Sequence, residues 1–262
     1  MARPRLAVTV DVERMHKTDF PGLVEWLELL DHFGVKATFF VTGDVLRNFE
    51  SHVRGVVAAG HEIASHGTNH PSISTPGFHD RLLPSLKDHQ LEEEIRRSRE
   101  EFEEKGIPVT GFRAVAHQAD ARVLAAIGRH FAYDSSVVKR SGPYRLAGST
   151  LEIPVTHLGW RTLRLGTPQM AFLGERTVAS LLNLLPTPLP WVFYAHSFDL
   201  IPLSGPLYAH YLKRRWYFDR TGTPLQVMIE RFLCRMKAQG AEFVRCTDVL
   251  REFETREKIG KP

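Results

Sequence analysis

The hydrophobic positions of the chain form short apolar runs that alternate with longer segments of helical periodicity. The runs are continuous, as expected for strands buried on both faces. The first three predicted strands span residues 5–12, 36–41 and 61–65. Between the first two, residues 21–33 have helical spacing, with Gly34 after the last turn, and a second helical pattern runs up to residue 59. This alternation predicts β/α units around a parallel sheet.

The second half of the chain continues the alternation. Helices are predicted over residues 88–105, 121–129, 175–185, 223–239 and 248–254, and strands around residues 111–114, 133–134, 151–155, 162–165, 191–195 and 242–245. Residues 71–86 have the Pro, Ser, Gly and His content of a loop. The sequence thus predicts an α/β fold, a distorted (β/α) barrel of about seven strands. One domain would cover residues 1–262, with its core at about 5–250.

Composition and the cysteine pattern bear on where in the cell the protein is expected. Hydrophobic residues make up 43% of the 262, enough for a packed core. Cys234 and Cys246 have no CxxC spacing, and a reducing environment suits them. The first residues run directly into a strand, without an export signal, and we find no apolar run near 18 residues. We therefore expect a cytoplasmic protein, with peripheral contact at the inner membrane face as an option.

The net charge of +4 weakly favours an anionic partner. Charge and aromatic side chains are concentrated at residues 213–218, KRRWYF. This run has two interpretations. It is an exposed lid, or it contacts a phosphate at the membrane surface. No base-reading motif accompanies it, which argues against nucleic acid as a partner.

The candidate chemistry begins with His66 and His70, which lie four residues apart after the third strand. A neutral imidazole is the commonest protein ligand of zinc and related ions, so this spacing permits two ligands to one metal. Further polar residues follow the other strands. The full set is Asp11, Glu13, His66, His70, Arg113, Asp134 and His196. Carboxylates, imidazoles and an arginine at one barrel rim suit metal-assisted hydrolysis of an amide, which needs a Lewis acid, a base and an acid.

These motifs resemble those of the polysaccharide deacetylases of the NodB-homology type, carbohydrate esterase family four. The family's HSxxH motif resembles His66-Gly-Thr-Asn-His70, and the strands ATFFVTG and GHEIASH before it are also typical. Its arginine motif is matched in part by residues 111–114, GFRA, its fourth motif by residues 133–136, YDSS, and its late histidine motif by residues 193–196, FYAH.

The resemblance implies roles for these residues. His66 and His70 would be metal ligands, for zinc or alternatively cobalt or nickel. The first acid of the first motif, Asp11, would be the general base. Arg113 would hold that base, with Asp134 supporting the arginine. His196 would be the general acid that protonates the departing amine.

The first motif departs from the family pattern of two adjacent acids, because it reads Asp11-Val12-Glu13. Alternation along a strand puts Asp11 and Glu13 on one side and Val12 on the other. We expect the two acids to divide the roles, with Glu13 on the metal and Asp11 as base, or the reverse. A site that binds metal poorly is the alternative.

Two further residues carry open alternatives. His117 follows the arginine motif, where the family's usual proline is Val115, and it is either a polar group of the site or a loop residue. Asp199 follows His196 by three residues and either raises the pKa of that histidine or faces solvent.

The sequence thus predicts a metal-dependent hydrolase that removes an N-acyl group, expected to be acetyl, from an amino sugar or a lipid-linked glycan precursor. Residues 153–156, IPVT, add a likeness to the deformylase of a lipid-linked formamido-arabinose. The alternatives are therefore that deformylase, a metal-independent amidohydrolase of the same fold, and a barrel that binds sugar without hydrolysing it.

Overall fold

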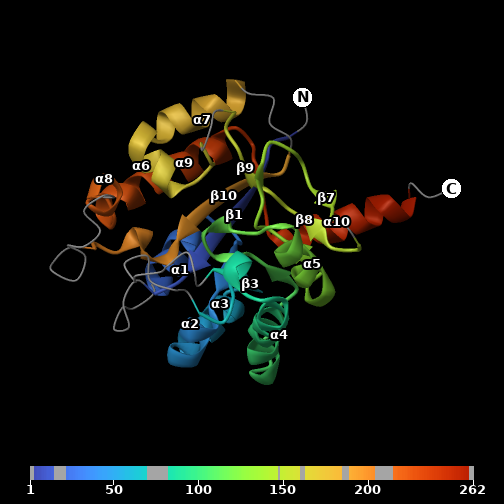
Figure 1. Ribbon diagram of the computed structural model, residues 1–262. Helices are drawn as coiled ribbons and strands as arrows, with labels where there is room; N and C mark the ends of the chain where they lie inside the picture. Colours follow the sequence, from blue (N-terminus) through green and yellow to red (C-terminus); the bar gives the residue numbers. More distant parts are fainter. Residues whose placement is uncertain are drawn as a thin grey trace.

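The computed structural model describes residues 3–14, 22–69, 82–146, 148–159, 163–184, 189–203 and 215–259. Its centre is a curled sheet surrounded by helices (Figure 1). Seven strands run parallel in the spatial order β10, β1, β2, β3, β4, β5, β8. Their bounds are β1 Arg5–Val12, β2 Thr38–Val41, β3 Glu62–Ser65, β4 Gly111–Phe112, β5 Tyr133–Asp134, β8 Leu151–Glu152 and β10 Trp191–His196.

Shorter strands extend this sheet at its ends. β7 (Tyr144–Arg145) pairs antiparallel with β8, and β11 (Glu242–Val244) pairs with the start of β1. β6 (Val138–Lys139) and β9 (Val155–Thr156) form a separate parallel pair.

Backbone hydrogen bonds through Leu165 connect β9 to β10 and so continue the curl of the sheet. The backbone N–H of Leu165 donates to Thr156, and the N–H of Tyr194 donates to Leu165, at 2.7 and 3.0 Å. Gly166 permits this approach, because a Cβ at that position would lie 2.2 Å from the Tyr194 ring. The predicted distorted (β/α) barrel is confirmed, although the strand expected around residues 162–165 is reduced to single bridges at Arg164 and Gly166.

Helices surround the sheet, and the last of them packs Val249 and Leu250 into the apolar cluster inside the curl. The helices are α1 Leu23–His32, α2 Gly43–Asn48, α3 Glu50–Ala58, α4 Asp88–Glu104, α5 Ala121–His130, α6 Thr167–Leu173, α7 Glu175–Leu184, α8 Arg215–Phe218, α9 Thr223–Ala238 and α10 Cys246–Ile259. The helical pattern predicted up to residue 59 is divided into α2 and α3, since Phe49 has φ −134° and ψ 37°. None of the described helices is long and apolar enough to cross a membrane.

The core has two layers, separated by the sheet. The outer layer lies between strands and helices and includes Val12 and Phe193. The inner layer fills the barrel and includes Ala7, Phe40 and Tyr194. Since successive strand residues point to opposite faces, each strand contributes to both layers. This alternation decides which side chains at the strand ends can enter the site.

Candidate functional site

The base and the acid of the predicted site lie side by side at the carboxyl ends of neighbouring strands. Asp11 of β1 and His196 of β10 are paired in register. On β1, Asp11 points to the same face as Ala7, and on β10, His196 points to the same face as Tyr194. Because Ala7 and Tyr194 belong to the inner layer, Asp11 and His196 face the inside of the barrel. Val12 is fully buried in the outer layer and cannot contribute to the site. The opposite orientations predicted for Asp11 and Val12 are therefore present.

Arg113 binds Asp11 inside the barrel. Its Nη1 donates to Asp11 Oδ1 at 2.7 Å and to Thr9 Oγ1 at 2.9 Å. Its other nitrogens donate to the backbone oxygen and hydroxyl of Ser135, at 3.1 and 2.9 Å. The guanidinium also lies 3.9 Å above the centre of the Phe40 ring. These contacts on several sides fix the arginine, and through it the carboxylate.

The ion pair controls the charge of Asp11. Burial alone would raise the pKa of this carboxyl, but the Arg113 guanidinium and the neighbouring imidazoles outweigh it and hold the pKa below its usual range. Asp11 is therefore ionised at neutral pH. It can accept a proton from water, although such a low pKa makes it a weak base unless the water is itself acidified.

Asp134 does not support the arginine directly. Its carboxylate accepts hydrogen bonds from the backbone and hydroxyl of Ser136, at 3.2 and 2.6 Å, and Ser136 in turn accepts from the backbone of Ala114. The reason is strand parity: Tyr133 belongs to the inner layer, so Asp134 points to the other face. Ser135, which the sequence analysis did not single out, holds Arg113 instead.

His66 is buried and oriented by the backbone of the arginine. Its Nδ1 lies 2.7 Å from the carbonyl oxygen of Arg113. Because a carbonyl only accepts, Nδ1 carries the hydrogen and the ring lone pair is on Nε2. A hydrogen bond of this kind to the far nitrogen is the usual support of a metal-ligating histidine.

The segment after His66 is anchored by two helices. Glu94 of α4 accepts from the backbone and hydroxyl of Thr68, at 2.9 and 2.6 Å, and Arg47 of α2 donates to Asn69 at 2.7 Å. Gly67 has φ +88°, which suits glycine. The chain is therefore held up to the residue before His70.

The predicted metal ligands are described only in part. Glu13 is buried, and its backbone oxygen accepts from Ser197 Oγ at 3.3 Å. His70 lies outside the described residues. In the part of the chain that is described, no three His, Cys, Asp or Glu side chains are grouped so that they could hold a metal. The ligand set of Glu13, or Asp11, with His66 and His70 stays a prediction.

His196 is held by a tyrosine that the sequence analysis missed. The Tyr217 hydroxyl lies 2.9 Å from His196 Nδ1 and donates a hydrogen bond to Asp199. The oxygen therefore accepts from Nδ1–H, which leaves Nε2 as the nitrogen that can transfer a proton. Asp199 is buried and also accepts from the His196 backbone at 2.7 Å. Burial and the nearby Asp199 raise the pKa of Tyr217 well above its usual value, so the hydroxyl stays protonated.

Tyr217 belongs to the KRRWYF run at residues 213–218, and its burial contradicts an exposed lid at the aromatic end of that run. The phosphate contact of the basic residues stays a prediction. Tyr217 and Phe218 are buried in the outer core, whereas Trp216 is half exposed. Residues 213 and 214 lie outside the described part. At the aromatic end of the run, Tyr217 holds His196. The apolar residues next to the charged ones are the feature of the sequence that could have predicted burial there.

His117 faces the site from the turn η3 (Val115–His117). Its ring packs edge-on against Tyr194 with ring centres 5.3 Å apart, and both ring nitrogens are buried with no hydrogen-bond partner among the described residues. Burial, and next the Arg113 guanidinium, lower the pKa of His117 well below its usual value, so the ring is neutral.

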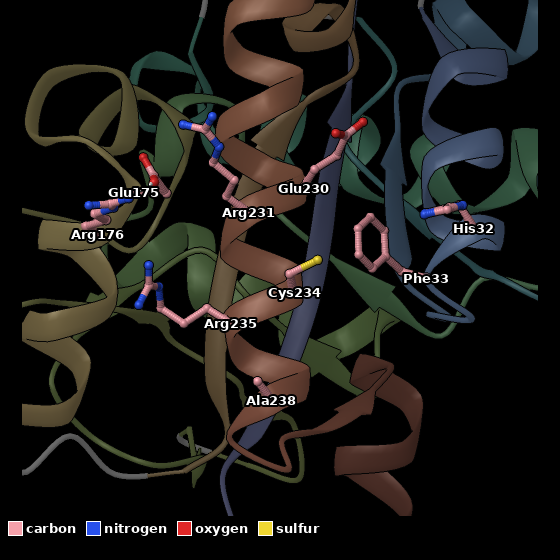
Figure 2. Close-up of a pocket in the computed structure, with 9 residues that line it drawn as sticks. All are labelled: His32, Phe33, Glu175, Arg176, Glu230, Arg231, Cys234, Arg235 and Ala238. Carbon is pink, nitrogen blue, oxygen red and sulfur yellow. Dashed lines mark ion pairs between the residues drawn. The ribbon is translucent and has the colours of Figure 1, made fainter.

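A separate hollow of about 660 Å³ lies on the outer surface beside α9 (Figure 2). Arg231 and Arg235 extend toward the start of α7, whereas Phe33 borders the opposite side of α9. None of the predicted site residues lines it; the lining residues are His32, Phe33, Glu175, Arg176, Glu230, Arg231, Cys234, Arg235 and Ala238. It is distinct from the strand-end site.

Comparison with known proteins relates the first half of the chain to a family of deacetylases. Residues 4–130 match the polysaccharide deacetylase family model. The resemblance predicted from the motifs is therefore confirmed. This matched segment contains Asp11, Glu13, His66, His70 and Arg113, whereas His196 lies beyond it.

Individual proteins are also similar to this chain in sequence or in structure. A stretch of 64 residues is 44% identical to a chitooligosaccharide deacetylase of Bradyrhizobium sp. (strain ANU 289), covering 23% of this chain and 29% of that protein. The chain thus spans under a third of this relative's length. A Mycobacterium smegmatis protein assigned as a polysaccharide deacetylase has a similar structure, with TM-score 0.70 and 21% identity over 97% of this chain and 91% of that one. Puue allantoinase has TM-score 0.68 and 16% identity, over 97% and 91%. At these identities the structures support the fold.

Proposed function

We propose that the protein hydrolyses the N-acetyl group of an amino sugar in a glucosamine-based oligosaccharide or glycan precursor, releasing acetate. The observation that carries this proposal is the ionised Asp11, bound to Arg113 and paired in register with His196 at the barrel mouth. A base and an acid on neighbouring strands can serve the two proton transfers of amide hydrolysis. The sugar substrate is suggested by the related chitooligosaccharide deacetylase.

In this mechanism Asp11 accepts the proton of the attacking water, while Arg113 keeps the carboxylate ionised and oriented. His196 donates a proton through Nε2 to the amine as the C–N bond breaks. Tyr217 holds the other nitrogen of the ring and so directs Nε2. Hydrolysis therefore consumes one water and yields acetate and a free amino sugar.

The described residues fit a metal of the family type. The backbone hydrogen bond at Nδ1 prepares Nε2 of His66 for ligation, and Glu13 is buried two residues after Asp11, where strand alternation predicts the same side. We propose that His66, His70 and Glu13 hold the ion, with Asp11 as the alternative acid. A bound divalent ion supplies Lewis acidity, which polarises the amide carbonyl and acidifies water.

Acetate release and metal content test the proposal. Wild-type protein should release acetate from a panel of chitooligosaccharides and of nucleotide-linked and lipid-linked N-acetyl amino sugars. Asp11→Asn should lower the rate at least about 100-fold, since base catalysis contributes about 10²–10⁴. Elemental analysis should find about one zinc, cobalt or nickel ion per chain, and His66→Ala and His70→Ala should lose it.

Other results would assign the alternatives. Formate release from an N-formyl amino sugar, without acetate release from N-acetyl sugars, would favour the deformylase. Hydrolysis by protein that keeps full activity after chelation would favour a metal-independent amidohydrolase. Bound metal with no hydrolysis across the panel would contradict the proposed activity and favour the sugar-binding barrel.

A further inference from the structure

The turn that carries His117 has a strained backbone. Ala116 and His117 have φ of 55° and 56°, and among the described residues they are the non-glycine residues with positive φ. Side chains with a Cβ are disfavoured in this left-handed region, and such strain is usually kept where it serves a site. In this conformation the His117 ring contacts Tyr194 of strand β10.

The imidazole is also unsatisfied. Both its nitrogens are buried, and no described residue forms a hydrogen bond with either. Buried polar atoms without partners cost stability. An apolar ring could make the same edge contact with Tyr194 without that cost, so packing alone does not explain a histidine here.

His117 is connected to the proposed acid through one aromatic ring. Its imidazole packs against Tyr194, whose ring centre is 5.7 Å from that of His196. The Asp11 carboxylate also interacts electrostatically with the His117 ring. The two ring nitrogens of His117 are therefore in the neighbourhood of the proposed base and acid.

We propose that His117 is a substrate-binding residue, whose imidazole hydrogen-bonds a sugar hydroxyl next to the acylated nitrogen. This inference rests on the proposed function. A neutral imidazole has one donor and one acceptor, as a hydroxyl does. An anionic group would be repelled by the nearby Asp11, whereas an uncharged hydroxyl satisfies a buried nitrogen without adding charge.

Binding of the N-acetylglucosamine tetramer tests the inference. Calorimetry in an Asp11→Asn background, which prevents turnover, should give a Kd at least about 5-fold higher after His117→Phe, the effect of one lost hydrogen bond. His117→Asn keeps a donor and an acceptor in a residue that tolerates positive φ, and should restore part of the affinity. In the otherwise wild-type chain, KM should rise about as much, with kcat changed less than about 3-fold.

His61 provides a matched control. Its ring packs edge-on against Phe39 with centres 5.3 Å apart, as His117 does on Tyr194, but its Nδ1 accepts from the backbone of Ala37 at 3.1 Å. His61→Phe should lower the melting temperature and leave the Kd for the tetramer unchanged. If His117→Phe does not fold, ¹⁵N-labelled histidine in Asp11→Asn protein gives the same answer: tetramer should shift the imidazole signals of His117 and not those of His61.

The outcomes separate this inference from the proposed function. Unchanged Kd in folded His117→Phe, or unshifted His117 signals on a tetramer that binds, overturns the inference even if wild type releases acetate. Tetramer binding that depends on His117, without acetate release, supports the inference and contradicts the proposed hydrolysis. Absence of both binding and acetate release contradicts both.

Discussion

At the scale of single residues, the proposed chemistry depends on groups that hold the base and the acid. Arg113 binds Asp11 and is itself held by Ser135 and Phe40. Tyr217 stands between His196 and Asp199. The sequence motifs predicted Asp11, Arg113 and His196, because their residue types and spacing are distinctive. Ser135 and Tyr217 lie within the YDSS and KRRWYF segments, but neither their residue type nor their spacing predicts which side chain they contact.

Tyr217→Phe tests the support of His196. Loss of the hydroxyl removes the acceptor for Nδ1–H and leaves buried Asp199 without one donor, so we expect kcat for deacetylation to fall about 10-fold and stability to fall by about 1–3 kcal/mol. Tyr194→Phe is the control, because that hydroxyl donates to Gln169 at 3.3 Å and not to His196. Steady-state kinetics and urea denaturation measure both effects. Equal kcat losses in the two variants would contradict a specific role for Tyr217.

At the scale of the element, parity along each strand decides which acids enter the barrel. Val12 and Asp134 point away from the inner layer, while Asp11 and Arg113 point into it. The parity of β1 is predictable from the sequence, because the strand has eight residues. β5 has two residues, which are too few to show alternation, and the family motif alone predicts that Asp134 lies beside the arginine.

Val12→Asp tests this account of β1. The substitution gives two adjacent acids, but parity directs the new carboxylate into the outer core beneath the helices. We expect the free energy of unfolding to fall by at least about 3 kcal/mol, the cost of an unpaired buried charge. Metal stoichiometry should not rise. Guanidinium denaturation and elemental analysis, with Val12→Thr as a smaller polar control, check this; a stable variant with tighter metal binding would contradict the orientation.

At the scale of the whole molecule, the barrel collects residues that are far apart in sequence. Asp11, His66, Arg113 and His196 come from β1 or from the ends of three other strands, and all parallel strands end at the same rim. The outer face of the barrel has its own buried charges. Asp134 and Glu152 are paired in register on β5 and β8, and both are fully buried.

This buried pair should make stability depend on pH. Burial, and next the charge of Asp134, raise the pKa of Glu152 well above its usual value. Above the ordinary glutamate pKa of about 4.3, the unfolded chain loses a proton that the folded protein keeps, so stability declines as pH rises toward the folded pKa. Glu152→Gln should remove this decline and exceed wild-type stability by more than about 1 kcal/mol at pH 7.

The difference between Glu152→Gln and wild type should shrink toward pH 4, where both states of the wild type hold the proton. Urea denaturation from pH 4 to pH 8 measures it, and Glu257→Gln, on α10 and more exposed, serves as the control. A constant difference across that range would show that the carboxyl pair does not retain its proton on folding.

The order of β/α units, the polar residues that follow the strands and the family motifs can be predicted from the sequence, because these depend on local periodicity and spacing. Gly34 and Gly106, for example, follow α1 and α4 with positive φ, as helix ends favour. In contrast, the contacts of Ser135 with Arg113, of Tyr217 with His196 and of His117 with Tyr194 follow from the fold. They join residues up to 77 positions apart, the separation of His117 and Tyr194 (194 − 117). Closure of the barrel brings these residues together, and the local pattern of one segment does not encode it.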